Sequence, residues 1–136
     1  MSVTLDALQK VPFLSHVQRK QLAGLAQTMA ERDVPPGKEI VTQGKGGVAF
    51  FLILDGQATV IVDGEERRTL GPSDHFGEIA LIVPDIPRTS TVRADTEMRL
   101  AALTAWNFKP FVMQNPDVAW ALLETLAKRF AATPHA

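Results

Sequence analysis

Residues Phe76–Ala94 read FGEIALIVPDIPRTSTVRA, and this stretch says more about the fold than any other part of the 136-residue chain. It places the acidic Glu78 and the basic Arg88 ten residues apart, each among apolar neighbours. Charges in apolar surroundings cost desolvation free energy unless a partner pairs with them. The pattern therefore predicts that a ligand pairs with these two side chains.

Composition limits the classes of function that the chain can have. A length of 136 residues with 46% hydrophobic and 21% charged residues is typical of one soluble globular domain. The net charge of −1 provides no basic face for nucleic acid, and the absence of cysteine excludes disulfides and thiolate metal sites. The sequence shows neither a signal-peptide pattern nor an apolar run of about 20 residues. We therefore expect a cytoplasmic protein without nucleic-acid or membrane partners.

The pattern predicts a single domain, residues 1–136, that begins with helices over residues 1–34. Ser15 and Gln18 form a capping-box pattern ahead of an amphipathic helix that Pro35-Pro36-Gly37 ends. The apolar stripe of this helix consists of Leu22, Leu25, Ala26 and Met29.

Residues 35–104 change to short apolar runs separated by turn signals such as Asp55-Gly56 and Asp63-Gly64. Many short strands at this spacing are typical of a jelly roll. One helical turn over residues 78–82 interrupts them. The expected strands are Glu39–Thr42, Ala49–Leu54, Gln57–Val62, Arg67–Leu70, Ser90–Ala94 and Met98–Leu103.

Residues 105–132 return to helix. Ala105–Gln114 is a short helix in which Pro110 either starts or kinks the structure. Asn115-Pro116 then provides an N-cap and a proline at the first position of the final helix. The fold class is therefore mainly β with flanking helices.

The segments Phe76–Leu81 and Pro87–Val92 together resemble the phosphate-binding cassette of cyclic nucleotide-binding domains. Such domains occur in the regulatory subunit of cyclic-AMP-dependent kinase, the bacterial catabolite activator and nucleotide-gated channels. Leu8–Leu14, Gly37–Gly44 and Asp55-Gly56 also match the family's order. The resemblance implies an eight-stranded β-roll with N-terminal helices and two C-terminal helices.

The resemblance also implies a ligand site, and each side chain suits its part of the nucleotide. Arg88 offers a planar fork for the phosphate, and Glu78 accepts the ribose hydroxyl. Gly77 allows close approach of the backbone, and the Ala80 amide of the helical turn points towards the anion. The implied site residues are Gly77, Glu78, Ile79, Ala80, Arg88, Thr89 and Ser90.

The ligand is cyclic AMP or cyclic GMP. Cyclic AMP is the first expectation, although Thr89 could hydrogen-bond the guanine amino group. The family draws its purine lid from the last helix, where Lys128, Arg129 and Phe130 are candidates. For Trp106 and Trp120 we expect core packing, with shielding of the purine by one of them as the alternative.

Several alternatives stay open. Without a ligand, Glu78 and Arg88 form a plain ion pair, and the domain is then a nucleotide-free interaction module. A cupin-type metal enzyme needs about three ligands, but His75 is the one histidine of the roll and we interpret it as a solvent-facing loop residue. Arg67 and Arg68 are interpreted as a solvated strand face, with an electrostatic contact for a partner as the alternative. No catalytic motif is present, so we expect no enzyme activity, cofactor or bound metal.

The expected mechanism is reversible nucleotide binding that repositions the C-terminal helices. The apolar stripe of the last helix predicts a protein partner or a homodimer through that helix.

Overall fold

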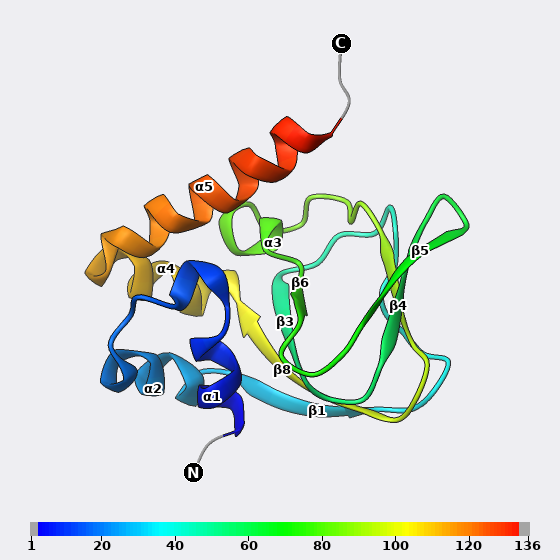
Figure 1. Cartoon of the computed structure of the whole chain (residues 1–136), viewed down its shortest axis with the longest axis horizontal. Helices are drawn as coiled ribbons and strands as arrows, with labels where there is room; N and C mark the ends of the chain where they lie inside the picture. Colours follow the sequence, from blue (N-terminus) through cyan, green and yellow to red (C-terminus); the bar gives the residue numbers. More distant parts are fainter. Residues whose placement is uncertain (1–2, 134–136) are drawn as a thin grey trace.

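The computed structural model describes residues 3–133, in which eight strands form two antiparallel four-stranded sheets. The sheet orders are β1-β8-β3-β6 and β2-β7-β4-β5. The expectation of a mainly β, eight-stranded roll with flanking helices is confirmed (Figure 1). The strands are β1 (Ala30–Val34), β2 (Glu39–Val41), β3 (Ala49–Asp55), β4 (Ala58–Val62), β5 (Glu65–Leu70), β6 (His75–Phe76), β7 (Thr91–Ala94) and β8 (Met98–Thr104).

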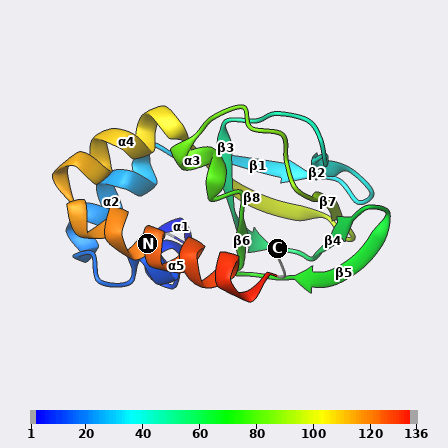
Figure 2. The ribbon, with the colours of Figure 1, turned by 90° about the horizontal axis from the view of Figure 1, so that it is seen from above.

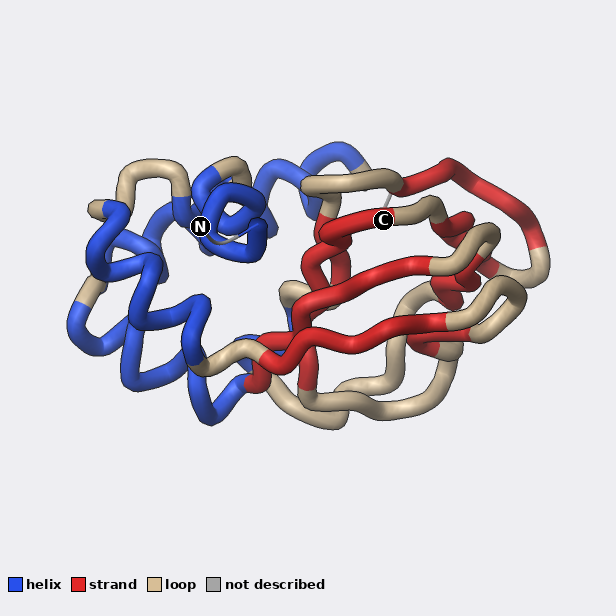
Figure 3. Tube along the Cα trace, turned by 90° about the horizontal axis from the view of Figure 1, so that it is seen from below, coloured by secondary structure: helices blue, strands red, loops and turns tan. Residues whose placement is uncertain are grey.

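Most helices gather at one end of the molecule and the strands at the other (Figures 2 and 3). They are α1 (Val3–Gln9), the 3₁₀ turn η1 (Pro12–Leu14), α2 (Arg19–Gln27), α3 (Ile79–Ile82), α4 (Ala105–Gln114) and α5 (Pro116–Ala132). Helix α5 passes over α3 towards the strands, with its last turns red in Figure 1. Within residues 3–133 no helix combines the length and apolarity needed to cross a bilayer.

Strand β3 lies between two hydrophobic clusters, because successive side chains of a strand point to opposite faces. Phe50 and Leu52 pack with the helices, including Leu8 and Leu122. Phe51 and Ile53 pack into the interior of the roll. One strand therefore connects the helical end to the β-roll and brings β6 and α3 beside both.

Strand β1 differs from the sequence expectation, which assigned residues 1–34 to helices. Its five residues pair with β8, from Ala30 opposite Ala102 to Val34 opposite Met98. The charged residues of this segment do not alternate with apolar ones, so the sequence did not indicate a strand. In the structure these charges pair across the sheet, because Arg99 forms ion pairs with Glu31 and Asp33 at 2.7 and 2.9 Å. The pairing partner is remote in sequence, so no local pattern indicates it.

The expected capping box is also wrong. The Ser15 hydroxyl donates to the carbonyl of Pro12 at 2.9 Å, and helix α2 begins at Arg19 with no side-chain cap. Met29 lies beyond the end of α2 but still packs against the helical cluster.

Candidate functional site

A cavity of about 160 Å³ lies where α3, β6 and the loop before β7 meet. Arg129 of α5 also lines it, and α5 passes above α3 in Figure 1. All seven residues implied by the cassette line this cavity: Gly77, Glu78, Ile79, Ala80, Arg88, Thr89 and Ser90. The two segments of the cassette thus form one wall of the cavity, together with Ile86 and Pro87.

Arg88 is held by the backbones of two loops. Its amide donates to the carbonyl of Lys45 and its carbonyl accepts from the amide of Gly44, both at 2.8 Å. The amide of Asp85 donates to the carbonyl of Gly47 at 2.9 Å. These bonds fix the point at which the Arg88 side chain enters the cavity.

The guanidinium of Arg88 is only partly satisfied by the protein. Nη2 donates to the carbonyl of Ala49 at 2.7 Å, whereas the buried Nε has no hydrogen-bond partner. Burial lowers the pKa of Arg88, and the charge of Glu78 opposes that shift. A buried unpaired donor is costly, so an anion in the cavity that accepts from Nε would relieve the cost.

Two glycines make room for this guanidinium. A Cβ at Gly47 would lie 2.6 Å from Arg88 Nη2, and one at Gly77 would lie 2.8 Å from Nη1. Gly77 also has a φ of 91°, which other residues rarely adopt. The sequence indicated Gly77 as the point where the backbone approaches the ligand, and not as room for the guanidinium.

Glu78 is 4% exposed, and the protein already bonds both of its carboxylate oxygens. His75 Nδ1 lies 2.6 Å from Oε1, and Arg129 Nη1 donates to Oε2 at 2.6 Å. Burial by itself would raise the pKa of Glu78, but the hydrogen bonds from His75 and Arg129 outweigh it and lower the pKa to about 2. Glu78 therefore pairs with these two residues, and the alternative of a plain Glu78–Arg88 ion pair is wrong.

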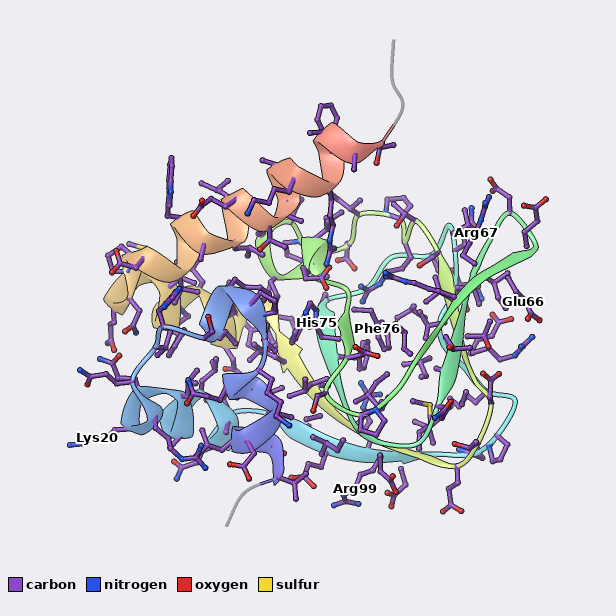
Figure 4. The ribbon with its side chains drawn as sticks, in the orientation of Figure 1. Lys20, Glu66, Arg67, His75, Phe76 and Arg99 are labelled. Atoms are coloured by element: carbon purple, nitrogen blue, oxygen red, sulfur yellow. The ribbon has the colours of Figure 1, made fainter. Side chains whose placement is uncertain are left out.

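His75 is not the solvent-facing loop residue that the sequence suggested. It belongs to β6 and its side chain is only 13% exposed. The ring lies 5.4 Å from that of Phe50 and 6.1 Å from that of Phe13, at the centre of the molecule in Figure 4. Among residues 3–133 no three histidine, aspartate or glutamate side chains form a group that could hold a metal ion.

The Ala80 amide was expected to point towards the anion as a free donor, but it is bonded within the protein. It donates to the carbonyl of Gly77 at 3.2 Å, which closes a tight turn at the start of α3. This donor is therefore paired within the protein. Thr89 and Ser90 line the cavity on the side of the loop.

The structure distinguishes among the lid candidates on the C-terminal helices. Arg129 lines the cavity, whereas Trp106 and Trp120 are 61% and 67% exposed, so the expectation that both tryptophans pack in the core is wrong. Three further lining residues, Val41, Arg68 and Ile86, were missed. Arg68 is exposed, but it lies two residues before the buried Leu70 on β5, and residues two apart on a strand share a face.

Comparison with known proteins identifies the family of the chain. The chain belongs to the cyclic nucleotide-binding domain family, whose sequence profile matches residues 31–115. A cAMP-dependent protein kinase regulatory subunit of Yarrowia lipolytica is 39% identical over 98 residues, covering 71% of this chain and 26% of that protein. The chain thus spans about a quarter of the length of that relative.

Solved structures share the fold. The N-terminal domain of a transcriptional regulator from Streptomyces coelicolor A3(2) superimposes with a TM-score of 0.77 and 31% identity, covering 93% of this chain and 90% of that one. The structure of Sp-2Cl-cAMPS bound to PKAR CBD2 gives a TM-score of 0.74 and 26% identity, covering 90% of this chain and 84% of that one.

Proposed function

We propose that the cavity binds a 3′,5′-cyclic purine nucleotide, cAMP or cGMP, whose phosphate is held by Arg88. The observation that carries the proposal is that Arg88, whose buried Nε has no partner, lines a cavity together with the other six residues implied by the cassette. A cyclic phosphodiester is a monoanion with two free oxygens, which suits a guanidinium fork. The structure of Sp-2Cl-cAMPS bound to PKAR CBD2 supports this class of ligand.

Glu78 takes the ribose in this proposal. An ionised carboxylate only accepts hydrogen bonds, and each of its oxygens has two lone pairs. His75 and Arg129 each use one oxygen, so a ribose 2′-hydroxyl can still donate to Glu78. The low pKa of about 2 keeps this acceptor ionised at neutral pH.

Helix α5 carries the signal. Arg129 connects α5 to the same carboxylate that receives the ribose, so occupancy of the cavity changes the free energy of this contact. The nucleotide shifts the position of α5 by as much as it prefers the closed arrangement. The role is that of a regulatory sensor, and the proposal assigns no catalytic step to the chain.

The outer face of α5 is a surface for a protein partner or a second copy of the chain. Trp120 and Leu123 are 67% and 54% exposed, and the exposed Ala127 continues their spacing along the helix. Apolar residues at intervals of three and four are typical of a helix-pairing seam. Sedimentation equilibrium with and without nucleotide measures whether this face pairs two copies.

Calorimetric titration with cAMP and cGMP tests the proposed function. We expect saturable one-site binding and a rise in the melting temperature with ligand concentration. A nucleotide-free module would instead give no heat and no thermal shift at millimolar nucleotide. A stoichiometric transition metal in the purified protein would favour the cupin-type enzyme.

A further inference from the structure

His75 lines the cavity, and the proposed function gives it no role of its own. Its Nδ1 lies 2.6 Å from Oε1 of Glu78. In the proposed function the Glu78 carboxylate takes the ribose hydroxyl. The inference that follows concerns what holds this carboxylate in place, and it rests on the proposed function.

The main chain of His75 is fixed by strand β3. His75 lies opposite Leu52 in the antiparallel pair of β6 with β3. The preceding residue is bonded to the same strand, since the amide of Ile53 donates to the carbonyl of Asp74 at 2.9 Å. Leu52 and Ile53 are fully buried. A shift of the His75 main chain would therefore break hydrogen bonds of the central strand.

The ring of His75 is fixed by two aromatic neighbours. Its centroid lies 5.4 Å from that of Phe50 and 6.1 Å from that of Phe13, with the Phe13 ring nearly perpendicular to it. Both phenylalanines belong to the buried cluster at the helical end of the molecule. Close packing on two sides limits the rotamers of a side chain, so Nδ1 is held towards Glu78.

The second group that bonds Glu78 has a different support. The Arg129 side chain is 50% exposed, against 13% for that of His75. Arg129 lies near the end of α5, where residues 127–132 are all exposed. A helix end with few buried contacts opens at a low free energy. Movement of α5 therefore changes the Arg129 contact directly, whereas the His75 contact does not involve that helix.

We propose that His75 is the positioning residue of the ribose site, and that it orients the Glu78 carboxylate towards the 2′-hydroxyl whether or not Arg129 is bonded. His75 thereby determines how strongly the domain distinguishes a cyclic ribonucleotide from its 2′-deoxy form. It acts through Glu78 and not by contact with the nucleotide, so its effect depends on the presence of the hydroxyl.

The test is calorimetric titration of the whole chain with cAMP, cGMP and their 2′-deoxy forms. Wild type should bind the ribonucleotide about tenfold more tightly than its 2′-deoxy form. His75→Phe keeps a ring beside Phe13 and Phe50 but lacks the donor. It should reduce this ratio to within about twofold and change the 2′-deoxy affinity by less than about twofold.

Two further variants separate the hydrogen bond from the packing. His75→Asn places an amide donor near the position of Nδ1, so it should keep the ratio within about threefold of wild type. Arg129→Ala should also keep the ratio, because His75 still holds the carboxylate. His16→Phe is the matched control, since it makes the same substitution at an exposed histidine that lines a different cavity. It should leave all affinities unchanged.

The nucleotide-free chain offers a second readout. An ionised carboxylate only accepts hydrogen bonds, so Nδ1 of His75 must carry a proton. Nitrogen NMR of the histidine ring should show that proton in wild type, and a bare Nδ1 would overturn the inference. Thermal unfolding of every variant checks that the fold is intact.

Equal losses for the ribonucleotide and its 2′-deoxy form in His75→Phe would overturn the inference, because they indicate direct contact or general damage. An unchanged ratio in His75→Phe, or a ratio lost in Arg129→Ala, would overturn it too. Each of these results includes nucleotide binding by wild type and leaves the proposed function standing. A wild-type chain that binds none of the nucleotides would overturn the proposed function and this inference together.

Discussion

The two charged residues of the cassette differ in how far the protein satisfies their hydrogen bonds. Arg88 enters the cavity with a buried Nε that nothing accepts from, while Glu78 has both carboxylate oxygens bonded by His75 and Arg129. Arg88 is held by the backbone of neighbouring loops, and Glu78 is connected to the last helix of the chain. A ligand can therefore add a missing hydrogen bond at Arg88, whereas at Glu78 it can change the contact with the last helix.

The difference assigns capture and transmission to different halves of the site. A phosphate that binds Arg88 satisfies an unpaired donor, and we expect this contact to be the main source of affinity. A ribose that binds Glu78 joins a hydrogen-bond network that already includes α5. Changes at Arg88 should therefore alter binding most, and changes at Arg129 should alter the response of α5 most.

Replacing Arg88 should have the largest effect. Arg88→Ala should weaken cyclic nucleotide binding by about 2–5 kcal/mol, because the buried phosphate loses its charged partner. Calorimetry measures the change, with Arg93→Ala as the control, since Arg93 makes exposed ion pairs with Glu66 and Asp95. An affinity of Arg88→Ala within threefold of wild type would place the phosphate elsewhere.

Acid should remove the stability contributed by Glu78. Its pKa falls from 4.5 to about 2 in the folded state, so the contribution is complete above pH 4.5 and is lost as the pH falls towards 2. At 1.36 kcal/mol per unit, the loss amounts to about 3 kcal/mol of unfolding free energy. Urea unfolding between pH 6 and 2 measures it.

Glu78→Gln removes the titrating group and should flatten this part of the pH profile. An identical profile in wild type and Glu78→Gln would show that other carboxylates cause the acid loss.

The ribose contact should be worth less than the phosphate contact. Glu78→Gln should cost about 1–2 kcal/mol of binding, because a neutral amide accepts a weaker hydrogen bond than a carboxylate. The 2′-deoxy nucleotide should bind wild type more weakly than its parent, and the two should bind Glu78→Gln more nearly alike. Equal binding of both nucleotides by wild type would remove Glu78 from the ribose site.

Arg129 should have the smallest effect on affinity. Its side chain is 50% exposed, so solvent screens the pair with Glu78, and Arg129→Ala should change binding by about 1 kcal/mol or less. Nucleotide should slow amide hydrogen exchange in α5 of the wild-type chain, but not in α5 of Arg129→Ala. Lys128→Ala, which changes the neighbouring residue, is the control and should behave like wild type. Protection of α5 that survives in Arg129→Ala would contradict this route of transmission.

The sequence predicted the parts of the site that are local. The cassette segments are continuous, and their seven implied residues line one cavity. The six strands that the apolar pattern indicated each overlap a strand of the roll. These features depend on neighbouring residues, so a pattern along the chain can show them.

The sequence failed where a residue's role depends on remote segments. The charged strand β1 is set by its pairing with β8, 68 residues away in the Glu31–Arg99 bond. His75 is buried by Phe13 and Phe50, which belong to η1 and β3. The position of Arg68 opposite Val60 follows from the register with β4, and the contact of Arg129 with Glu78 joins residues 51 apart.

A crystal structure of the chain with a bound cyclic nucleotide tests the central claim most directly. The account predicts a phosphate oxygen within hydrogen-bond distance of Nε of Arg88 and the ribose 2′-hydroxyl at the Glu78 carboxylate. A nucleotide whose phosphate lies away from Arg88, with Nε still unpaired, would contradict it.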